Sequence, residues 1–171
     1  LTTLLEIIRE AGSEILSVYS GNSNFRVNYK EDDSPITKAD RLANRIIVRA
    51  LKKLPVKFPI LSEESEKPIY RERESWTDYW LVDPLDGTKE FIKRNGEFTV
   101  NIAHIRNGVP EMGAVHVPVS GVTYLGKKGF GAWMVDQDDV TKEIHARKME
   151  NSSSSIKAVS YTHLRAHETG Y

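Results

Sequence analysis

The sequence predicts a layered α/β fold in which amphipathic helices cover one side of a sheet. Apolar residues recur at helical spacing in two segments, residues 3–19 and 37–54. Between residues 98 and 135, short apolar segments alternate with turns rich in Gly, Asn and Pro, which is typical of consecutive strands. Near residue 83 a polar turn follows an apolar run, and ligand-binding sites in α/β sheets form at strand ends of this kind.

The amino-acid composition by itself excludes several classes of function. A chain of 171 residues fits one domain, or one domain and part of a second. Lys+Arg and Asp+Glu number 24 each, so no bulk charge indicates a nucleic acid or an anionic membrane as a partner. The chain has no cysteine, which excludes disulfides, thiolate metal sites and thiol catalysis. No apolar run approaches the roughly 20 residues that a membrane helix needs.

The first half of the chain is expected to form two helices and two strands. The helix over residues 3–19 is followed by a strand over residues 25–29 and a polar loop over residues 30–35. Thr37 and Asp40 have the spacing of a capping box, so the residues by themselves assign Asp40 to the start of the second helix. Residues 58–61 then form a short buried strand, and residues 67–78 an irregular charged loop.

The strand over residues 58–61 delivers two adjacent glutamates, Glu63 and Glu64. Such a pair is typical of a solvated loop. The pair also follows the end of a strand, where ligands bind in open α/β sheets. The alternative interpretation is therefore that the pair belongs to a ligand-binding site.

The stretch Trp80–Lys89 places two carboxylates, Asp83 and Asp86, at the end of a strand-type run. Pro84 is expected to stop the strand, and Gly87 to allow a backbone conformation or a close ligand approach that a side chain would obstruct. Lys89 begins a helical segment, whose free N–H groups attract anions. One interpretation is a surface turn. The other is a magnesium-dependent phosphatase site, with hard oxygen ligands beside an anion site.

Several remaining residues have plain structural interpretations. Gly129 and Gly131 favour a hairpin turn over a phosphate loop. Trp76 and Trp80 are expected to pack in the core, and the histidines at positions 104 and 116 to be packed or surface residues.

The motif Trp80–Thr88 resembles the metal motif of the inositol monophosphatase superfamily of lithium-sensitive, magnesium-dependent phosphatases. Its continuation over residues 89–103 resembles the 3'(2'),5'-bisphosphate nucleotidase branch. The resemblance extends from the first helix to about residue 150 and implies the inositol monophosphatase / sugar-phosphatase fold. Residues 1–150 would be an N-terminal metal-binding phosphatase domain with helices packed on a mainly antiparallel sheet.

The resemblance also implies roles for individual residues. Asp40 and Thr88 would orient and deprotonate the attacking water, and Glu64 would assist at a distance. Mg²⁺ would be held by Glu63, Asp83, the carbonyl of Leu85, and Asp86. The phosphorylated substrate would contact Glu63, Asp86, Gly87 and Thr88.

The implied reaction is hydrolysis of 3'-phosphoadenosine 5'-phosphate to AMP and phosphate. The partner is then a small phosphorylated nucleotide, with no nucleic acid and no membrane span, in a protein that is cytoplasmic or peripheral on the inner membrane. Two alternatives stay open. One is a phosphatase of the same superfamily that acts on inositol or fructose phosphates. The other is an inactive fragment that binds metal or phosphate without turnover.

The C-terminal part departs from the family pattern. Residues 151–155 read Asn-Ser-Ser-Ser-Ser, a linker-like run, and residues 151–171 are expected to be a linker and a truncated, non-native start of a second domain. The resemblance implies a further metal-binding aspartate after a tryptophan there, and no Trp-Asp pair follows residue 136. Low or absent activity is therefore expected of this polypeptide.

Overall fold

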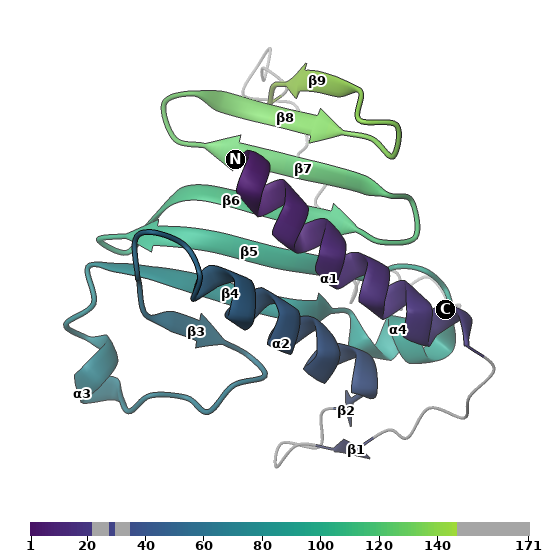
Figure 1. Ribbon diagram of the computed structural model, residues 1–171, viewed down its shortest axis with the longest axis horizontal. Helices are drawn as coiled ribbons and strands as arrows, with labels where there is room; N and C mark the ends of the chain where they lie inside the picture. Colours follow the sequence, from purple (N-terminus) through teal and green to yellow (C-terminus); the bar gives the residue numbers. More distant parts are fainter. Residues whose placement is uncertain (22–27, 30–34, 147–171) are drawn as a thin grey trace, which may run out of the picture.

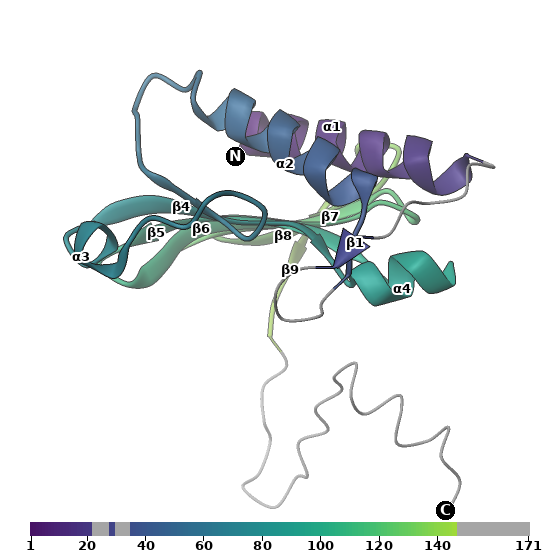
Figure 2. The ribbon, with the colours of Figure 1, turned by 90° about the horizontal axis from the view of Figure 1, so that it is seen from below.

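The computed structural model describes residues 1–21, 28–29 and 35–146 of the chain. Their arrangement has two main layers, a pair of helices and a sheet (Figures 1 and 2). Helices α1 (Thr2–Ser20) and α2 (Lys38–Leu51) lie side by side on one face of the sheet. The amphipathic pattern of both segments therefore predicted the helices correctly, although α2 ends at Leu51 and not at residue 54.

The sheet has seven strands in sequence order. Only β3 and β4 pair in parallel, and every later pair is antiparallel, so the sheet is mainly antiparallel as expected. The strands are β3 (Ile60–Ser62), β4 (Asp78–Asp86), β5 (Thr99–Arg106), β6 (Val109–Val117), β7 (Val122–Lys127), β8 (Gly131–Val135) and β9 (Thr141–Ile144). Strands β1 (Asn28–Tyr29) and β2 (Pro35–Ile36) pair separately, and two short helices are α3 (Tyr70–Arg73) and α4 (Thr88–Lys93).

The core lies between the two helices and the sheet. Helix α1 buries residues at positions 4, 7, 8, 11 and 15, one stripe of a helix with 3.6 residues per turn. Alanines 39 and 43 of α2 are fully buried, and their small side chains allow close approach to the sheet and to α1. On the strands, alternate residues such as Val100 and Ile102 face this layer, because side chains alternate between the two faces.

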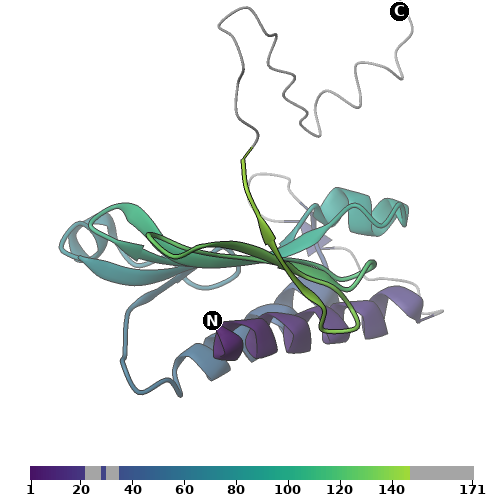
Figure 3. The ribbon, with the colours of Figure 1, turned by 90° about the horizontal axis from the view of Figure 1, so that it is seen from above.

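The opposite face of the sheet carries no helix layer within the described ranges, as Figure 3 shows. Leu81, Val115 and Tyr124 stand on this face with 42%, 40% and 41% of their surface exposed. Helix α4 lies at one end of the sheet, where β4 finishes (Figure 1). An aromatic cluster holds it there, since the ring of Phe91 packs 5.3 Å from that of Phe98 and 5.2 Å from that of Tyr19.

Two expectations about local structure were wrong, and one strand was missed. Pro84 does not stop its strand: β4 continues to Asp86, and the pairing with β5 absorbs an extra residue between Asp83 and Asp86. Such a bulge is where a sheet tolerates a residue without an N–H. Residues 67–78 include the helical turn α3, and β9 was not foreseen. The predicted strand over residues 25–29 falls largely outside the described residues.

Candidate active site

The start of helix α2 fixes the carboxylate of Asp40. Its Oδ2 accepts hydrogen bonds from the backbone N–H of Thr37, at 2.7 Å, and from the Thr37 hydroxyl. The Thr37 hydroxyl oxygen in turn accepts from the N–H of Ala39, which completes the capping box that the spacing predicted. Asp40 is only 2% exposed, so hydrogen bonds to neighbouring protein groups fix the position of its carboxylate.

The second oxygen of this carboxylate faces a residue far away in sequence. Asp40 Oδ1 accepts a 3.0 Å hydrogen bond from the hydroxyl of Thr88, at the start of α4. Burial raises the pKa of Asp40, and the bonds from Thr37 and Thr88 oppose that effect. Asp40 can therefore cap helix α2 through one carboxylate oxygen and pair with Thr88 through the other.

The turn between β4 and α4 depends on a glycine. Gly87 has φ = 94°, in the left-handed region that favours glycine. A Cβ there would lie 2.8 Å from the carbonyl oxygen of Glu97, so a side chain would collide with the backbone. The bulge and this turn bring the Leu85 carbonyl 3.3 Å from the Thr88 hydroxyl, whose single hydrogen lies closer to Asp40 Oδ1 as acceptor, at 3.0 Å between the heavy atoms.

Parallel pairing of β3 with β4 places Glu63 beside Asp83. Ser62 is in register with Val82, and the backbone N–H of Glu63 donates to the Val82 carbonyl at 3.1 Å. Burial and the nearby carboxylates of Glu63 and Asp86 raise the pKa of Asp83 to about 7. The carboxylate of Glu63, from the turn after β3, and that of Asp86, from β4, thus both act electrostatically on Asp83.

Two asparagines that sequence reasoning missed hold these carboxylates in place. Asn44 on α2 accepts a 2.7 Å bond from Ser62 and donates to the carbonyl of Glu64, which anchors the turn that carries Glu63. Asn101 on β5 donates to Asp86 Oδ2 at 3.3 Å. A polar side chain within an apolar helix or strand pattern was the only signal for either.

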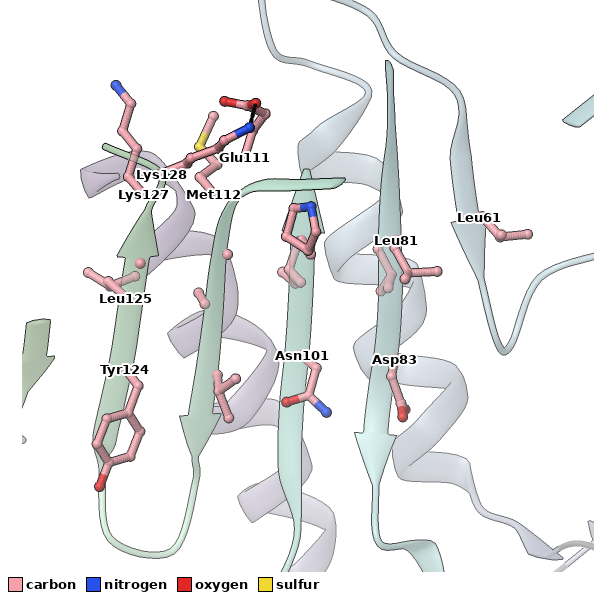
Figure 4. Close-up of a pocket in the computed structure, with 18 of the residues that line it drawn as sticks. Leu61, Leu81, Asp83, Asn101, Glu111, Met112, Tyr124, Leu125, Lys127 and Lys128 are labelled. Atoms are coloured by element: carbon pink, nitrogen blue, oxygen red, sulfur yellow. Dashed lines mark hydrogen bonds and ion pairs between the residues drawn. The ribbon is translucent and has the colours of Figure 1, made fainter. Parts of the chain in front are cut away.

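The open face of the sheet carries a groove of about 930 Å³ next to these residues. Figure 4 shows Leu61, Leu81, Asp83 and Asn101 projecting from adjacent strands, with the helices behind the sheet. The groove extends along this face to Tyr124 on β7. Most of its lining is apolar, so the carboxylates form a polar margin to an apolar surface.

The sequence matches the family described as the inositol monophosphatase family over residues 1–170. The chain belongs to this family. It is 47% identical over 147 residues to the 3'(2'),5'-bisphosphate nucleotidase CysQ of Salmonella typhimurium, a match that covers 86% of this chain and 58% of that protein. The CysQ protein of Escherichia coli K12 gives the same identity and the same coverage.

Solved structures of related proteins share the fold. CysQ from Bacteroides thetaiotaomicron has a TM-score of 0.72 and 34% identity, covering 98% of this chain and 66% of its own. The extragenic suppressor protein suhB from Bartonella henselae has a TM-score of 0.70 and 31% identity, covering 80% and 52%. The chain thus spans little more than half the length of the curated relatives it matches, 58% for the two CysQ proteins above.

The side chains at this site are of the type that binds a divalent cation, but they do not already surround one position. Asp83 Oδ1 is buried and has no hydrogen-bond partner among the described residues. Hard carboxylate oxygens are the ligands that Mg²⁺ prefers. Within residues 1–21, 28–29 and 35–146, however, no three acidic or histidine side chains already converge on one point. Glu63 is exposed and its carboxylate lies beside that of Asp83.

The structure also bears on the predictions made for Trp80, the two histidines and the turn between β7 and β8. Trp80, His104 and His116 are buried, and residues 128–130 form the turn between β7 and β8, so the structural interpretations of these segments were correct. In the described part of the chain, no helix has the length and apolarity to cross a bilayer. The division at residue 150 stays a prediction, because residues 147–171 lie outside the described ranges.

Proposed function

We propose that this chain carries the catalytic carboxylates of a magnesium-dependent phosphomonoesterase that hydrolyses 3'-phosphoadenosine 5'-phosphate to AMP and phosphate. The observation that carries the proposal is the hydrogen bond from Thr88 to Asp40, beside the carboxylates of Glu63, Asp83 and Asp86. Choice of this substrate draws on the 47% identity to bisphosphate nucleotidases.

The Asp40–Thr88 pair has the geometry of a proton relay. The Thr88 hydroxyl gives its hydrogen to Asp40 Oδ1, so a lone pair on Oγ1 is left to accept a proton from an attacking water. Because burial raises the pKa of Asp40, this carboxylate is a stronger base than an exposed aspartate. Thr37 holds the other oxygen, which fixes the direction of the relay.

The carboxylates of Glu63, Asp83 and Asp86, with the Leu85 carbonyl, would hold Mg²⁺. When bound, such a cation neutralises charge on the phosphate oxygens and lowers the pKa of water. The raised pKa of Asp83 reflects crowding of negative charge, which a cation would relieve. We further propose that the N–H groups of Gly87 and Thr88 contact the phosphate, with Glu63 and Asp86 as further substrate contacts.

The test is phosphate release from 3'-phosphoadenosine 5'-phosphate with and without Mg²⁺, for this chain, Asp83→Asn and the exposed control Asp138→Asn. Release that requires Mg²⁺, persists in Asp138→Asn and disappears in Asp83→Asn is the expected result. Release that is equal in Asp83→Asn, or independent of Mg²⁺, would overturn the proposal. Parallel reactions with inositol 1-phosphate and fructose 1,6-bisphosphate identify the substrate class.

Absence of release from a folded chain has a separate meaning, because the relatives are longer than this chain. Calorimetric titration with Mg²⁺ then decides whether the metal part of the proposal holds. Binding that Asp83→Asn abolishes would mark the chain as a metal-binding portion of the phosphatase. Absence of both binding and release would refute the metal assignment.

A further inference from the structure

The turn after β3 carries Glu63, and only one end of that turn is fixed by the sheet. The N–H of Glu63 donates to the carbonyl of Val82 on β4 at 3.1 Å. Beyond this point the chain leaves the ladder between β3 and β4, whose last paired residues are Ser62 and Val82. Exposed turns at the end of a ladder are ordinarily among the least stable parts of a fold. The position of Glu63 therefore depends on what holds the rest of the turn.

The bonds within the turn itself are long. The N–H of Ser65 donates to the Ser62 carbonyl at 3.4 Å, and the N–H of Glu64 donates to the Ser62 hydroxyl oxygen, also at 3.4 Å. Hydrogen bonds between N–H and oxygen are usually 2.7–3.2 Å long. The internal bonds of the turn are thus too weak to fix its shape alone.

Asn44 on α2 supplies the shorter bonds. Its Oδ1 accepts a 2.7 Å bond from the Ser62 hydroxyl. Its Nδ2 donates to the carbonyl of Glu64 and to the hydroxyl oxygen of Ser65, both at 3.1 Å. A backbone carbonyl only accepts, so the amide can face Glu64 only through its NH₂ group, and its oxygen then faces Ser62. One side chain thus binds the residues on both sides of Glu63.

Asn44 also stands one helical turn after Asp40. Residues four apart lie on the same face of a helix. From this face, Asp40 accepts a bond from Thr88, at the start of α4, and Asn44 binds the turn after β3. A rigid helix therefore sets the position of the Glu63 turn relative to the Asp40–Thr88 pair.

We propose that Asn44 is a positioning residue of the candidate metal site. By holding Ser62 and Glu64, it keeps Glu63 beside Asp83 before a cation binds, so that binding does not have to order the turn. Groups that orient metal ligands in this way commonly set the affinity of the site. The inference rests on the proposed function, because it concerns the ligands proposed there.

The first test is calorimetric titration of Mg²⁺ into the parent chain and Asn44→Leu, a substitution that nearly preserves side-chain volume. We expect the variant to bind Mg²⁺ about 10-fold more weakly, the lower end of the effect of removing an orienting group. Arg45→Ala, at the next and exposed position of α2, is the matched control and is expected to keep the parent affinity.

A double variant separates positioning from a purely structural role. Asn44→Leu leaves the hydroxyl of Ser62, a residue only 2% exposed, without its acceptor, so the thermal midpoint without metal is expected to fall. Asn44→Leu combined with Ser62→Ala removes both partners and is expected to recover part of the midpoint. The Mg²⁺ affinity is expected to stay about 10-fold weaker, because the turn is still untethered. Recovery of the affinity together with the midpoint would overturn the proposal.

A measurement without metal tests the tether itself. Amide hydrogen exchange at Glu64 and Ser65 is expected to be about 5-fold faster in Asn44→Leu, the effect of losing about one hydrogen bond. Exchange at Ile102, in the middle of β5, is the internal reference. Unchanged exchange in the turn would overturn the proposal, whether or not Mg²⁺ binds.

The same data distinguish failure of this inference from failure of the proposed function. A parent chain that binds Mg²⁺ no better than Asn44→Leu does would overturn the positioning role alone. A parent chain that binds no Mg²⁺ would refute the metal assignment, and the positioning role with it.

Discussion

At the residue scale, Asp40 combines a helix cap with the role of base that we propose for it. Each of its oxygens has a different set of donors: Thr37 occupies Oδ2 and Thr88 occupies Oδ1. This division explains why a capping interpretation and a catalytic one are not in competition. The proposed reaction depends on the Thr88 hydroxyl, which donates to Asp40 Oδ1 from the start of α4.

Two substitutions at Thr88 distinguish the contribution of its hydroxyl from that of the rest of the side chain. Thr88→Val keeps the shape and removes the proton path, so magnesium-dependent phosphate release is expected to fall by about 10²–10⁴-fold. Thr88→Ser keeps the hydroxyl and is expected to retain most of the rate. Initial rates for both variants at saturating substrate test this, and a fully active Thr88→Val would show that the relay is not used.

A second residue-scale prediction concerns His116, whose Nδ1 lies 2.9 Å from the Thr123 hydroxyl. Burial, and then the charge of Arg9, lower the pKa of His116 to about 4. The unfolded chain protonates this residue near pH 6.5, so between about pH 6.5 and 4 the unfolded state binds more protons. Stability is therefore lost as the pH falls through that window, by at most roughly 3 kcal/mol from this group.

The measurement is the urea midpoint at pH 7 and pH 5. We expect the parent chain to lose stability at pH 5 and His116→Gln to lose less of it. His145→Gln is the matched control, because that side chain is 76% exposed. A parent midpoint that is unchanged between the two pH values would contradict the prediction.

At the element scale, α1 packs on the sheet through a position where only glycine fits. A Cβ on Gly12 would lie 2.4 Å from Cδ2 of His116, a buried ring held by Thr123. Alanine normally favours a helix over glycine by about 1 kcal/mol. Here the clash has to move the ring or the helix, and overpacking of this kind costs about 1–3 kcal/mol.

Gly12→Ala is therefore expected to lower the thermal midpoint, although its helix propensity is higher. Ser13→Ala, at the next and exposed position, is expected to leave the midpoint unchanged or raise it slightly. Thermal unfolding followed by circular dichroism compares the two. A more stable Gly12→Ala variant would show that α1 and the sheet tolerate a wider separation.

At the scale of the whole molecule, the proposed metal site would link cation binding to folding. Glu63 follows β3 whereas Asp83 and Asp86 lie on β4, so Glu63 comes beside Asp83 only in the folded state. A ligand that binds the folded state alone stabilises it by about 2.7 kcal/mol at one hundred times its dissociation constant. For a chain of this size that corresponds to about 5–10 °C in the thermal midpoint.

Mg²⁺ is accordingly expected to raise the thermal midpoint of the parent chain, and EDTA to reverse the increase. Asp83→Asn is expected to lose most of the increase, while Asp138→Asn keeps it. Differential scanning fluorimetry over a Mg²⁺ series measures the effect. An equal increase in Asp83→Asn would mean that the cation stabilises the chain elsewhere.

Local patterns determined a large part of this protein from sequence alone. The helical spacing of apolar residues, the three-residue spacing of Thr37 and Asp40, and the turn at Gly87 all involve neighbours in the chain, so residue type and spacing suffice to predict them. The Trp80–Thr88 motif also indicated the family that the comparisons then showed. Pro84 was misjudged because β5 tolerates a bulge at that point, which only the neighbouring strand decides.

Only the tertiary structure decided which distant groups meet. Thr88 lies 48 residues from Asp40, and Asn44 bonds to Ser62 18 residues away. The rings of Trp80 and His104 contact one another because β4 and β5 pair in a particular register. These contacts depend on strand register and on how the helices dock. Both are set by burial summed over the whole core, and therefore have no local signature at the residues concerned.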